Sequence, residues 1–251
     1  MAACFSPMTW LFLESPPCPA PLNMALDEAL LELAPEVRHP VLRFYGWSEP
    51  AASFGYFQRM AEVERLTLLR PLVRRPTGGG LVPHDADWTY SLTFPRGHLW
   101  YELAAEESYR RAHEWLRWAF AQVGVETELA PCCRPSAGQC FAGYEKSDLL
   151  WHGKKVAGAA QRRTKLGLLI QGSIQPPPLR LRRPAWQAAM RSTATRQWAV
   201  DWLVLPGLEA GTGPALPGIH PQLAETAAKL RDVVTRLAQA KYSQDAYNRK
   251  R

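Results

Sequence analysis

The sequence lacks a hydrophobic run long enough to cross a membrane, and it lacks the paired cysteines of a zinc or redox motif. The apolar run at residues 10–13 is too short for a signal-peptide core or a membrane span. Five cysteines are present, an odd number, and none lies in a CxxC pair. We therefore expect a cytoplasmic protein that needs no metal and has at least one thiol without a structural role.

Acidic residues are missing from one long stretch of the chain. Residues 151–200 contain ten Lys and Arg and no Asp or Glu, within a chain of net charge +7. Such a segment predicts a positive surface that attracts acidic partners, although a solvated basic face without any partner has the same composition. Because no zinc finger, RNA-binding aromatic motif or basic helix is visible, we expect no nucleic-acid ligand. We expect no membrane partner either.

The spacing of apolar residues predicts an α+β fold with a mixed or antiparallel sheet. With 251 residues and 47% hydrophobic composition, the chain can bury the core of one compact domain. Helices are expected from an N-cap at Asn23, over 60–69, over 109–123 and over about 221–240. Strands are expected at 10–13, 41–45, 88–94 and 167–174, together with a hairpin that turns at His152 and Gly153. An extended, proline-rich connector is expected near 176–184.

Three consecutive glycines form the first candidate site. Gly78, Gly79 and Gly80 leave the backbone amides open to close approach by a ligand, with Arg74 before them and His84 after them. This group of residues suits an anionic or carbonyl-bearing ligand. A glycine triplet also occurs in plain turns, and its spacing matches neither a P-loop nor a dinucleotide fingerprint.

A lysine strand and a cysteine form the second candidate site. In KKVAGAAQRR from Lys154, the small residues Gly158 and Ala159 allow a ligand or a neighbouring backbone to approach Lys155. Cys140 lies in GQCFAGY, about fifteen residues before that lysine. A cysteine near cationic side chains holds more thiolate at neutral pH, which nucleophilic catalysis requires. Taken singly, small residues also serve close packing, and most cysteines are structural.

Several spaced blocks of this sequence resemble the biotin/lipoate protein ligase and transferase family, over roughly residues 10–175. The blocks are NMALDEALL from Asn23, LRFYGWSEPAASFGYFQ from Leu42, RRPTGGGLVPHD from Arg74, TYSL from Thr89, GKKVAGAAQRR from Gly153 and GLLIQGSI from Gly167. The resemblance implies the catalytic fold shared with class II aminoacyl-tRNA synthetases and biotin synthetases, a mixed sheet with flanking helices. It divides the chain into a catalytic core at 1–175, a Pro/Gly-rich connector at 176–218 and a C-terminal helix with a basic tail at 219–251.

The resemblance also implies roles for the candidate residues. Lys155 matches the family lysine that hydrogen-bonds the acyl carbonyl, and Cys140 would take the acyl group as a thioester. The substrate would lie against Arg74, the glycines Gly78 to Gly80, His84, Gly158 and Ala159. His84 would position or deprotonate a reacting group.

The family contains two chemistries, and the residues favour one of them. Cys140 and the short segment of 77 residues after Ile174 indicate an octanoyl or lipoyl transferase without cofactors. Its partners would be octanoyl-acyl carrier protein as donor and a lipoyl domain or glycine-cleavage carrier protein as acceptor. Gly80 resembles the ligases, so an ATP-dependent lipoate-protein ligase using ATP and Mg is the alternative. A non-catalytic binder of acylated carrier or lipoyl proteins is a further one.

Overall fold

The computed structural model describes residues 8–134, 141–207 and 221–250, and its centre is a mixed eight-stranded sheet. The strand order is β11-β1-β2-β6-β10-β9-β8-β7. The strands are β1 (Met8–Glu14), β2 (Val41–Tyr45), β6 (Trp88–Pro95), β7 (Glu128–Leu129), β8 (Leu149–Trp151), β9 (Lys154–Arg163), β10 (Gly167–Ile174) and β11 (Val200–Val204). Strand β1 runs parallel to β2 and β11, and the remaining pairs are antiparallel. The predicted α+β class with a mixed sheet is confirmed.

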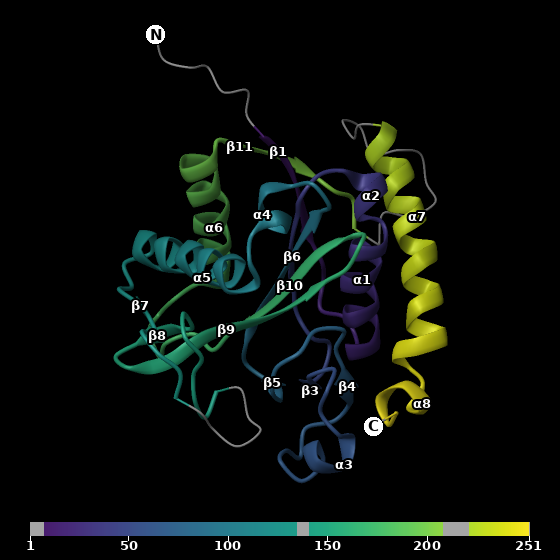
Figure 1. Cartoon of the computed structure of the whole chain (residues 1–251), viewed down its shortest axis with the longest axis horizontal. Helices are drawn as coiled ribbons and strands as arrows, with labels where there is room; N and C mark the ends of the chain where they lie inside the picture. The colour runs from purple at the N-terminus through teal and green to yellow at the C-terminus, as the bar shows by residue number, and fades with distance from the viewer. Residues whose placement is uncertain (1–7, 135–140, 208–220, 251) are drawn as a thin grey trace.

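Helices cover both faces of this sheet (Figure 1). Helices α5 (Ala105–Gln122) and α6 (Arg183–Trp198) lie on one face, and α1 (Ala20–Glu32) and α7 (Pro221–Leu237) lie on the other. Shorter helices are α2 (Ala34–Val37), α3 (Met60–Val63), α4 (Leu99–Glu102) and α8 (Asp245–Asn248), and a π-helical turn (Ala238–Tyr242) follows α7. None of the described helices is long and apolar enough to cross a membrane.

A second, three-stranded sheet packs near one end of the large one. Its order is β4-β3-β5, with β3 (Ala51–Phe54), β4 (Leu72–Arg74) and β5 (Val82–His84). The loop from β4 to β5 contains the three glycines. Because β4 and β5 flank β3, both ends of this loop are fixed to the same strand.

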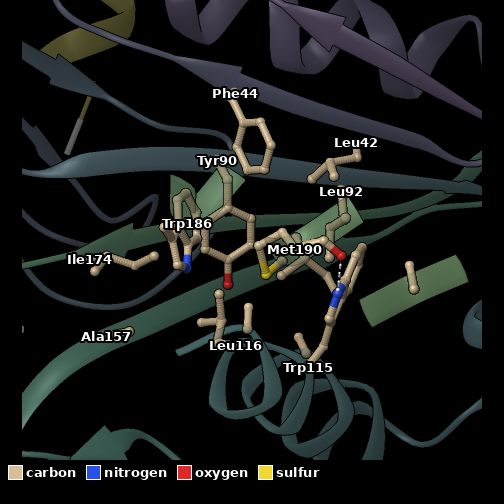
Figure 2. Packing of buried hydrophobic residues seen from close by; sticks show 14 of the residues in the cluster. Leu42, Phe44, Tyr90, Leu92, Trp115, Leu116, Ala157, Ile174, Trp186 and Met190 are labelled. Carbon is tan, nitrogen blue, oxygen red and sulfur yellow. Dashed lines mark hydrogen bonds between the residues drawn. The ribbon is translucent and has the colours of Figure 1, made fainter. Parts of the chain in front are cut away.

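A second apolar cluster lies on the side of the large sheet that α1 and α7 cover. The largest apolar cluster lies between the sheet and helices α5 and α6. Alternate residues of β2, β6 and β10 point to this face and pack against helix side chains such as Leu116, Trp186 and Met190 (Figure 2). The predicted alternation at 88–94 is confirmed, since Tyr90, Leu92 and Phe94 belong to this core. The predicted long helix at 109–123 is confirmed as α5, which begins four residues earlier at Ala105 and ends at Gln122.

Three expected elements differ from the structure. Helix α1 begins at Ala20 with Pro19 as its N-cap and Pro21 in its first turn, a position that suits proline. Asn23 is a buried interior residue and not the N-cap. Helix α3 ends at Val63 and not near residue 69. The expected connector at 176–218 contains α6 and β11, since Trp186, Ala189 and Met190 recur at helical spacing and bury one helix face.

Candidate active site

The face of the sheet that α1 covers carries two rows of small and polar side chains near the three-stranded sheet. Because residues paired across antiparallel strands share a face, the register defines each row. The first row is Tyr45, Thr89, Ser173 and Gly158, and the second is Arg43, Ser91, Gln171 and Ala160. We call these the polar rows. They place hydrogen-bonding groups where an ordinary sheet would bury aliphatic ones.

A buried ion pair organises the second polar row. Arg43 Nη1 lies 2.6 Å from Asp27 Oδ1, and both side chains are fully buried. Asp27 also accepts hydrogen bonds from Tyr45 Oη at 3.0 Å, Ser91 Oγ at 2.7 Å and Gln171 Nε2 at 2.7 Å. Burial, and next the Asp27 charge, raise the pKa of Tyr45 well above its ordinary value, so this hydroxyl remains a donor. The network joins α1 rigidly to three strands of the sheet.

The glycine loop folds around the guanidinium group of Arg75. Its Nη2 donates to the carbonyl oxygens of Gly78 at 2.5 Å and Gly80 at 2.7 Å, and its Nη1 donates to Ser53 O at 3.2 Å. Gly79 has φ of 85°, a left-handed conformation that glycine adopts without strain. A side chain at Gly55 would overlap the Gly79 carbonyl. The loop therefore has a fixed shape.

Arg74, the predicted site residue, points elsewhere. Its guanidinium is buried among backbone carbonyls and donates to Tyr56 O and Gln58 O at 2.7 Å each and to Asn248 O at 2.8 Å. Its backbone amide donates to Asn248 Oδ1 at 2.9 Å. Arg74 thus ties strand β4 to the C-terminal helix α8, and its neighbour Arg75 is the arginine beside the cavity.

His84 is the centre of a buried hydrogen-bonded chain. Its Nε2 lies 2.8 Å from Ser53 Oγ and its Nδ1 lies 2.9 Å from Asp87 Oδ2, while its ring stacks on Trp47 at 3.8 Å. Asp87 Oδ2 also accepts from Thr89 Oγ1. Because a carboxylate only accepts, the proton is assigned to Nδ1, and Nε2 then accepts from the serine hydroxyl.

A small cavity of about 30 Å³ lies between the polar rows, the glycine loop and His84. This volume admits only a few water molecules and is well below the roughly 300–1,000 Å³ of small-molecule sites. Its lining includes Met24, Trp47, Arg75, His84, Ala160 and Ser173. The wall is thus partly apolar and partly hydrogen-bonding, which suits a slender acyl chain better than a charged nucleotide.

Lys155 lies on β9, the strand that contributes Ala160 to the cavity wall, and its side chain is only 4% exposed. Its Nζ is 2.7 Å from Asp148 Oδ2, and a Cβ atom built on Gly158 would lie 2.7 Å from the same Nζ. Gly158 pairs with Ser173, which lines the cavity, so the amine is adjacent to it. Phe141 places its ring centroid 5.3 Å from Nζ.

The remaining predicted residues separate into two groups. Gly158 lies on the cavity face of the sheet. Ala159 lies on the opposite face, because it pairs with Gly172, which packs against the Tyr90 ring there. Ala160 is the alanine that lines the cavity. Cys140 lies outside the described residues. Among the residues that the structure describes, no group of three His, Cys, Asp or Glu side chains is arranged to hold a metal ion.

Comparison with known proteins agrees with this geometry. A model of the lipoyl protein ligase A/B catalytic domain matches residues 19–175. The chain belongs to this family. Its glycine loop, His84 and lysine strand all lie within the matched segment, and the family resemblance of the sequence is confirmed.

Two bacterial octanoyltransferases are among the curated relatives that resemble this chain. Octanoyltransferase LipM of Geobacillus kaustophilus (strain HTA426) is 37% identical over 179 residues, which cover 66% of this chain and 64% of the relative's length. Octanoyltransferase LipM of Bacillus subtilis (strain 168) is 31% identical over 283 residues, which cover 97% of this chain and 99% of the relative.

Solved structures share the fold at low sequence identity. A putative lipoate protein ligase of T. acidophilum has a TM-score of 0.73 at 18% identity, covering 97% of this chain and 100% of that one. A lipoate-protein ligase A bound with ATP has a TM-score of 0.71 at 19% identity, covering 96% and 98%. Similarity at this level establishes the fold, and the expected mixed sheet with flanking helices is confirmed.

Sequence reasoning missed several residues that build the site. Arg75, Ser53, Trp47 and Asp148 come from separate segments, and the three-stranded sheet and the β8–β9 pair bring them beside the predicted lysine and histidine. The sequence signal for this part of the site was the pair of arginines before the glycine triplet. The strand register was needed to show that Arg75, and not Arg74, faces the cavity.

Proposed function

We propose that this protein transfers an octanoyl group from acyl carrier protein to a lysine of a lipoyl domain or a glycine-cleavage carrier protein. It would act in the cytoplasm, through a Cys140 thioester and without a metal or cofactor. The observation that carries the proposal is the position of Lys155, a buried amine on the strand that contributes Ala160 to the cavity wall, with Phe141 against it. Cys140 directly precedes Phe141 in the chain.

The proposed reaction has two balanced steps. The Cys140 thiolate attacks the thioester carbonyl of the donor, a new carbon–sulfur bond forms, and the donor's thiolate leaves and takes up the proton that the cysteine lost. The neutral amine of the acceptor lysine then attacks the acyl-enzyme. A carbon–nitrogen bond forms, the bond to Cys140 breaks, and the amine's proton passes to the released thiolate. No ATP is required, because the thioester already holds the acyl group in an activated form.

Lys155 would stabilise both tetrahedral states. An N–H donor aimed at the carbonyl oxygen is worth about 10²–10³ in rate when negative charge develops there. The family match and the octanoyltransferase relatives support the proposed octanoyl transfer. The proposed acyl chain would run from Lys155 along Ala160 and Ser173 toward His84 and Trp47.

The acid-free segment 151–200 supports the choice of partners. Exposed cations there include Lys154, Lys165, Arg180 and Arg196. A positive surface speeds encounter with acidic proteins, and the effect weakens as salt rises. Transfer at low protein concentration should therefore slow as ionic strength increases.

A transfer assay tests the proposal. The purified protein is mixed with octanoyl carrier protein and a lipoyl domain without ATP, and in parallel with free octanoate or lipoate, ATP and Mg²⁺. Octanoylation of the lipoyl domain in the first mixture alone supports the proposal. Modification only in the second mixture identifies a ligase, and binding without modification in either identifies a non-catalytic binder.

A pair of cysteine variants sharpens this assay. Cys140→Ser should abolish transfer, because a hydroxyl is a far poorer nucleophile at neutral pH than a thiolate. Cys133→Ser is the matched control, since Cys133 is an exposed thiol of the same chain segment. Full activity in Cys140→Ser would reject the thioester route.

A further inference from the structure

Beside the cavity, a carboxylate and an amine are buried together. Asp148 has a fully buried side chain and Lys155 one that is 4% exposed, with 2.7 Å between Oδ2 and Nζ. Burying two charges costs free energy that their attraction does not always recover, so an ion pair of this kind is weak evidence for a stabilising role. A functional role is then the first alternative to consider.

Asp148 is held in one orientation from several directions. Its Oδ1 accepts a short hydrogen bond from the Tyr109 hydroxyl on α5, and its Oδ2 accepts from the Glu145 backbone N–H at 2.7 Å. Its own backbone N–H donates to Glu145 O at 3.0 Å, and its carbonyl accepts from Ala130 N–H at 2.8 Å. The Asp148 carboxylate therefore has a fixed position, and the Lys155 side chain must extend to reach it.

Strand β9 leaves open the place where the amine lies. A Cβ atom at Gly158 would be 2.6 Å from Lys155 Cε, 2.7 Å from Nζ and 3.1 Å from Asp148 Oδ1. Only a residue without a side chain allows the lysine to cross its own strand at this point. The same glycine pairs with Ser173 in the cavity wall, so the amine lies next to the strand that forms this wall.

We propose that Asp148 is a positioning residue that acts through Lys155. Its fixed carboxylate takes one N–H of the ammonium group and thereby aims the rest of that group at the acyl carbonyl oxygen. This inference rests on the proposed acyl transfer. A lysine has four rotatable side-chain bonds, and fixing its end in advance removes an entropic cost from each tetrahedral state.

The test combines Asp148→Asn with Lys155→Ala in a double-mutant cycle of octanoyl transfer. Asp148→Asn should lower kcat about 10²-fold while KM for octanoyl carrier protein changes less than about threefold, because the interaction operates in the transition state. In the Lys155→Ala background the same change should alter the residual rate by less than about twofold. An Asp148→Asn enzyme as active as the wild type, or losses that multiply in the double variant, would overturn the inference.

Two further variants separate this role from a structural one. Tyr109→Phe keeps the carboxylate and removes one of its hydrogen bonds, and it should lower kcat about threefold to tenfold. It also serves as the test if Asp148→Asn does not fold, and wild-type kcat in it would then count against the proposal. Glu106→Gln is the matched control, because it removes a 2.6 Å ion pair with Lys146 in which both side chains are more than half exposed. It should leave transfer unchanged.

The outcomes also distinguish this inference from the proposed function. If the wild-type protein transfers no octanoyl group, or if Lys155→Ala is fully active, the proposed function fails and the role of Asp148 fails with it. If Lys155→Ala is inactive and Asp148→Asn is not impaired, the proposed function stands and only the positioning role is rejected.

Discussion

The two faces of the large sheet are ordered by different forces, although the same strands supply both. On the α5 and α6 face, Phe44, Tyr90 and Leu92 pack with aromatic and aliphatic helix side chains (Figure 2). On the α1 face, the alternate residues of the same strands are Arg43, Ser91 and Gln171, which are joined by directional hydrogen bonds to Asp27.

The fold thus assigns stability to one face of the sheet and the chemistry of the site to the other. Apolar packing is non-directional and tolerates many arrangements of the same volume, so the α5 and α6 face can hold the domain together. Buried polar groups must each find a partner, so the α1 face specifies one geometry. We therefore expect substitutions on the first face to change stability and substitutions on the second to change catalysis.

The largest expected effect is the loss of stability caused by a substitution that opens a cavity on the apolar face. Phe44 is fully buried and its ring lies 5.2 Å from that of Trp186 and 5.7 Å from that of Phe12. Phe44→Ala should lower the free energy of unfolding by about 3–5 kcal/mol, because the neighbouring rings cannot fill the space. Urea denaturation measures this loss. A change below about 1 kcal/mol would show that this face is not the stabilising one.

Low pH should reduce the free energy of unfolding through His113, which lies on the same side of the sheet. This ring is fully buried on α5, and burial lowers its pKa from 6.5 to about 4. At pH values between these two pKa values, the histidine binds a proton in the unfolded chain and stays neutral in the native state. The free energy of unfolding should therefore fall as pH drops from about 6.5 to about 4, on the order of 2–3 kcal/mol from this residue.

A histidine variant checks the acid prediction. Denaturation of His113→Phe across this pH range should show a shallower decline than the wild type does. His39→Gln is the control, because His39 is exposed and its replacement should leave the decline unaltered. An equal slope in all three proteins would contradict the assignment to His113.

Two glycines of paired strands provide a matched contrast between the faces. A side chain at Gly172 would overlap the Tyr90 ring, which is fully buried and cannot move aside. Gly172→Ala should therefore lower the free energy of unfolding by about 1–3 kcal/mol, as overpacking does. Thermal or urea denaturation gives the value, and an unchanged midpoint would show that the core around Tyr90 is looser than its packing indicates.

The smallest effect on stability is expected from the opposite glycine. A side chain at Gly158 would meet the flexible end of Lys155, which can move. Gly158→Ala should keep its stability within about 1 kcal/mol of the wild type and lose about tenfold in kcat, because the amine is displaced. Steady-state transfer and denaturation are measured on the same preparation. An unchanged kcat would show that the position of the Lys155 amine does not matter for the reaction.

The sequence predicted the parts of the fold that depend on periodic apolar residues. The alternation from Trp88 to Phe94 and the spacing in α5 identified the main strand and helix, because burial on one face imposes a period. Helix α6 was missed because it follows a proline-rich, arginine-rich segment and its buried stripe includes Gln187 and Thr193. A polar stripe of that kind has weak hydrophobic contrast.

The candidate site was predictable where its residues are adjacent in sequence. Lys155 with Gly158 and the glycine triplet with His84 each occupy one segment, so local spacing reveals them. Asp148 and Ser53 acquire their roles only through strand pairing and through helix α5, and no local pattern marks them. Long-range contacts of this type depend on the whole fold.

The thioester route is tested most directly by the intact mass of the protein after it has been mixed with octanoyl carrier protein alone, with the acceptor omitted. The wild type and Cys133→Ser should each gain the mass of one octanoyl group, which is released when a lipoyl domain is added, and Cys140→Ser should gain none. An unmodified wild-type protein that nevertheless octanoylates the acceptor, or a modified Cys140→Ser, would contradict it.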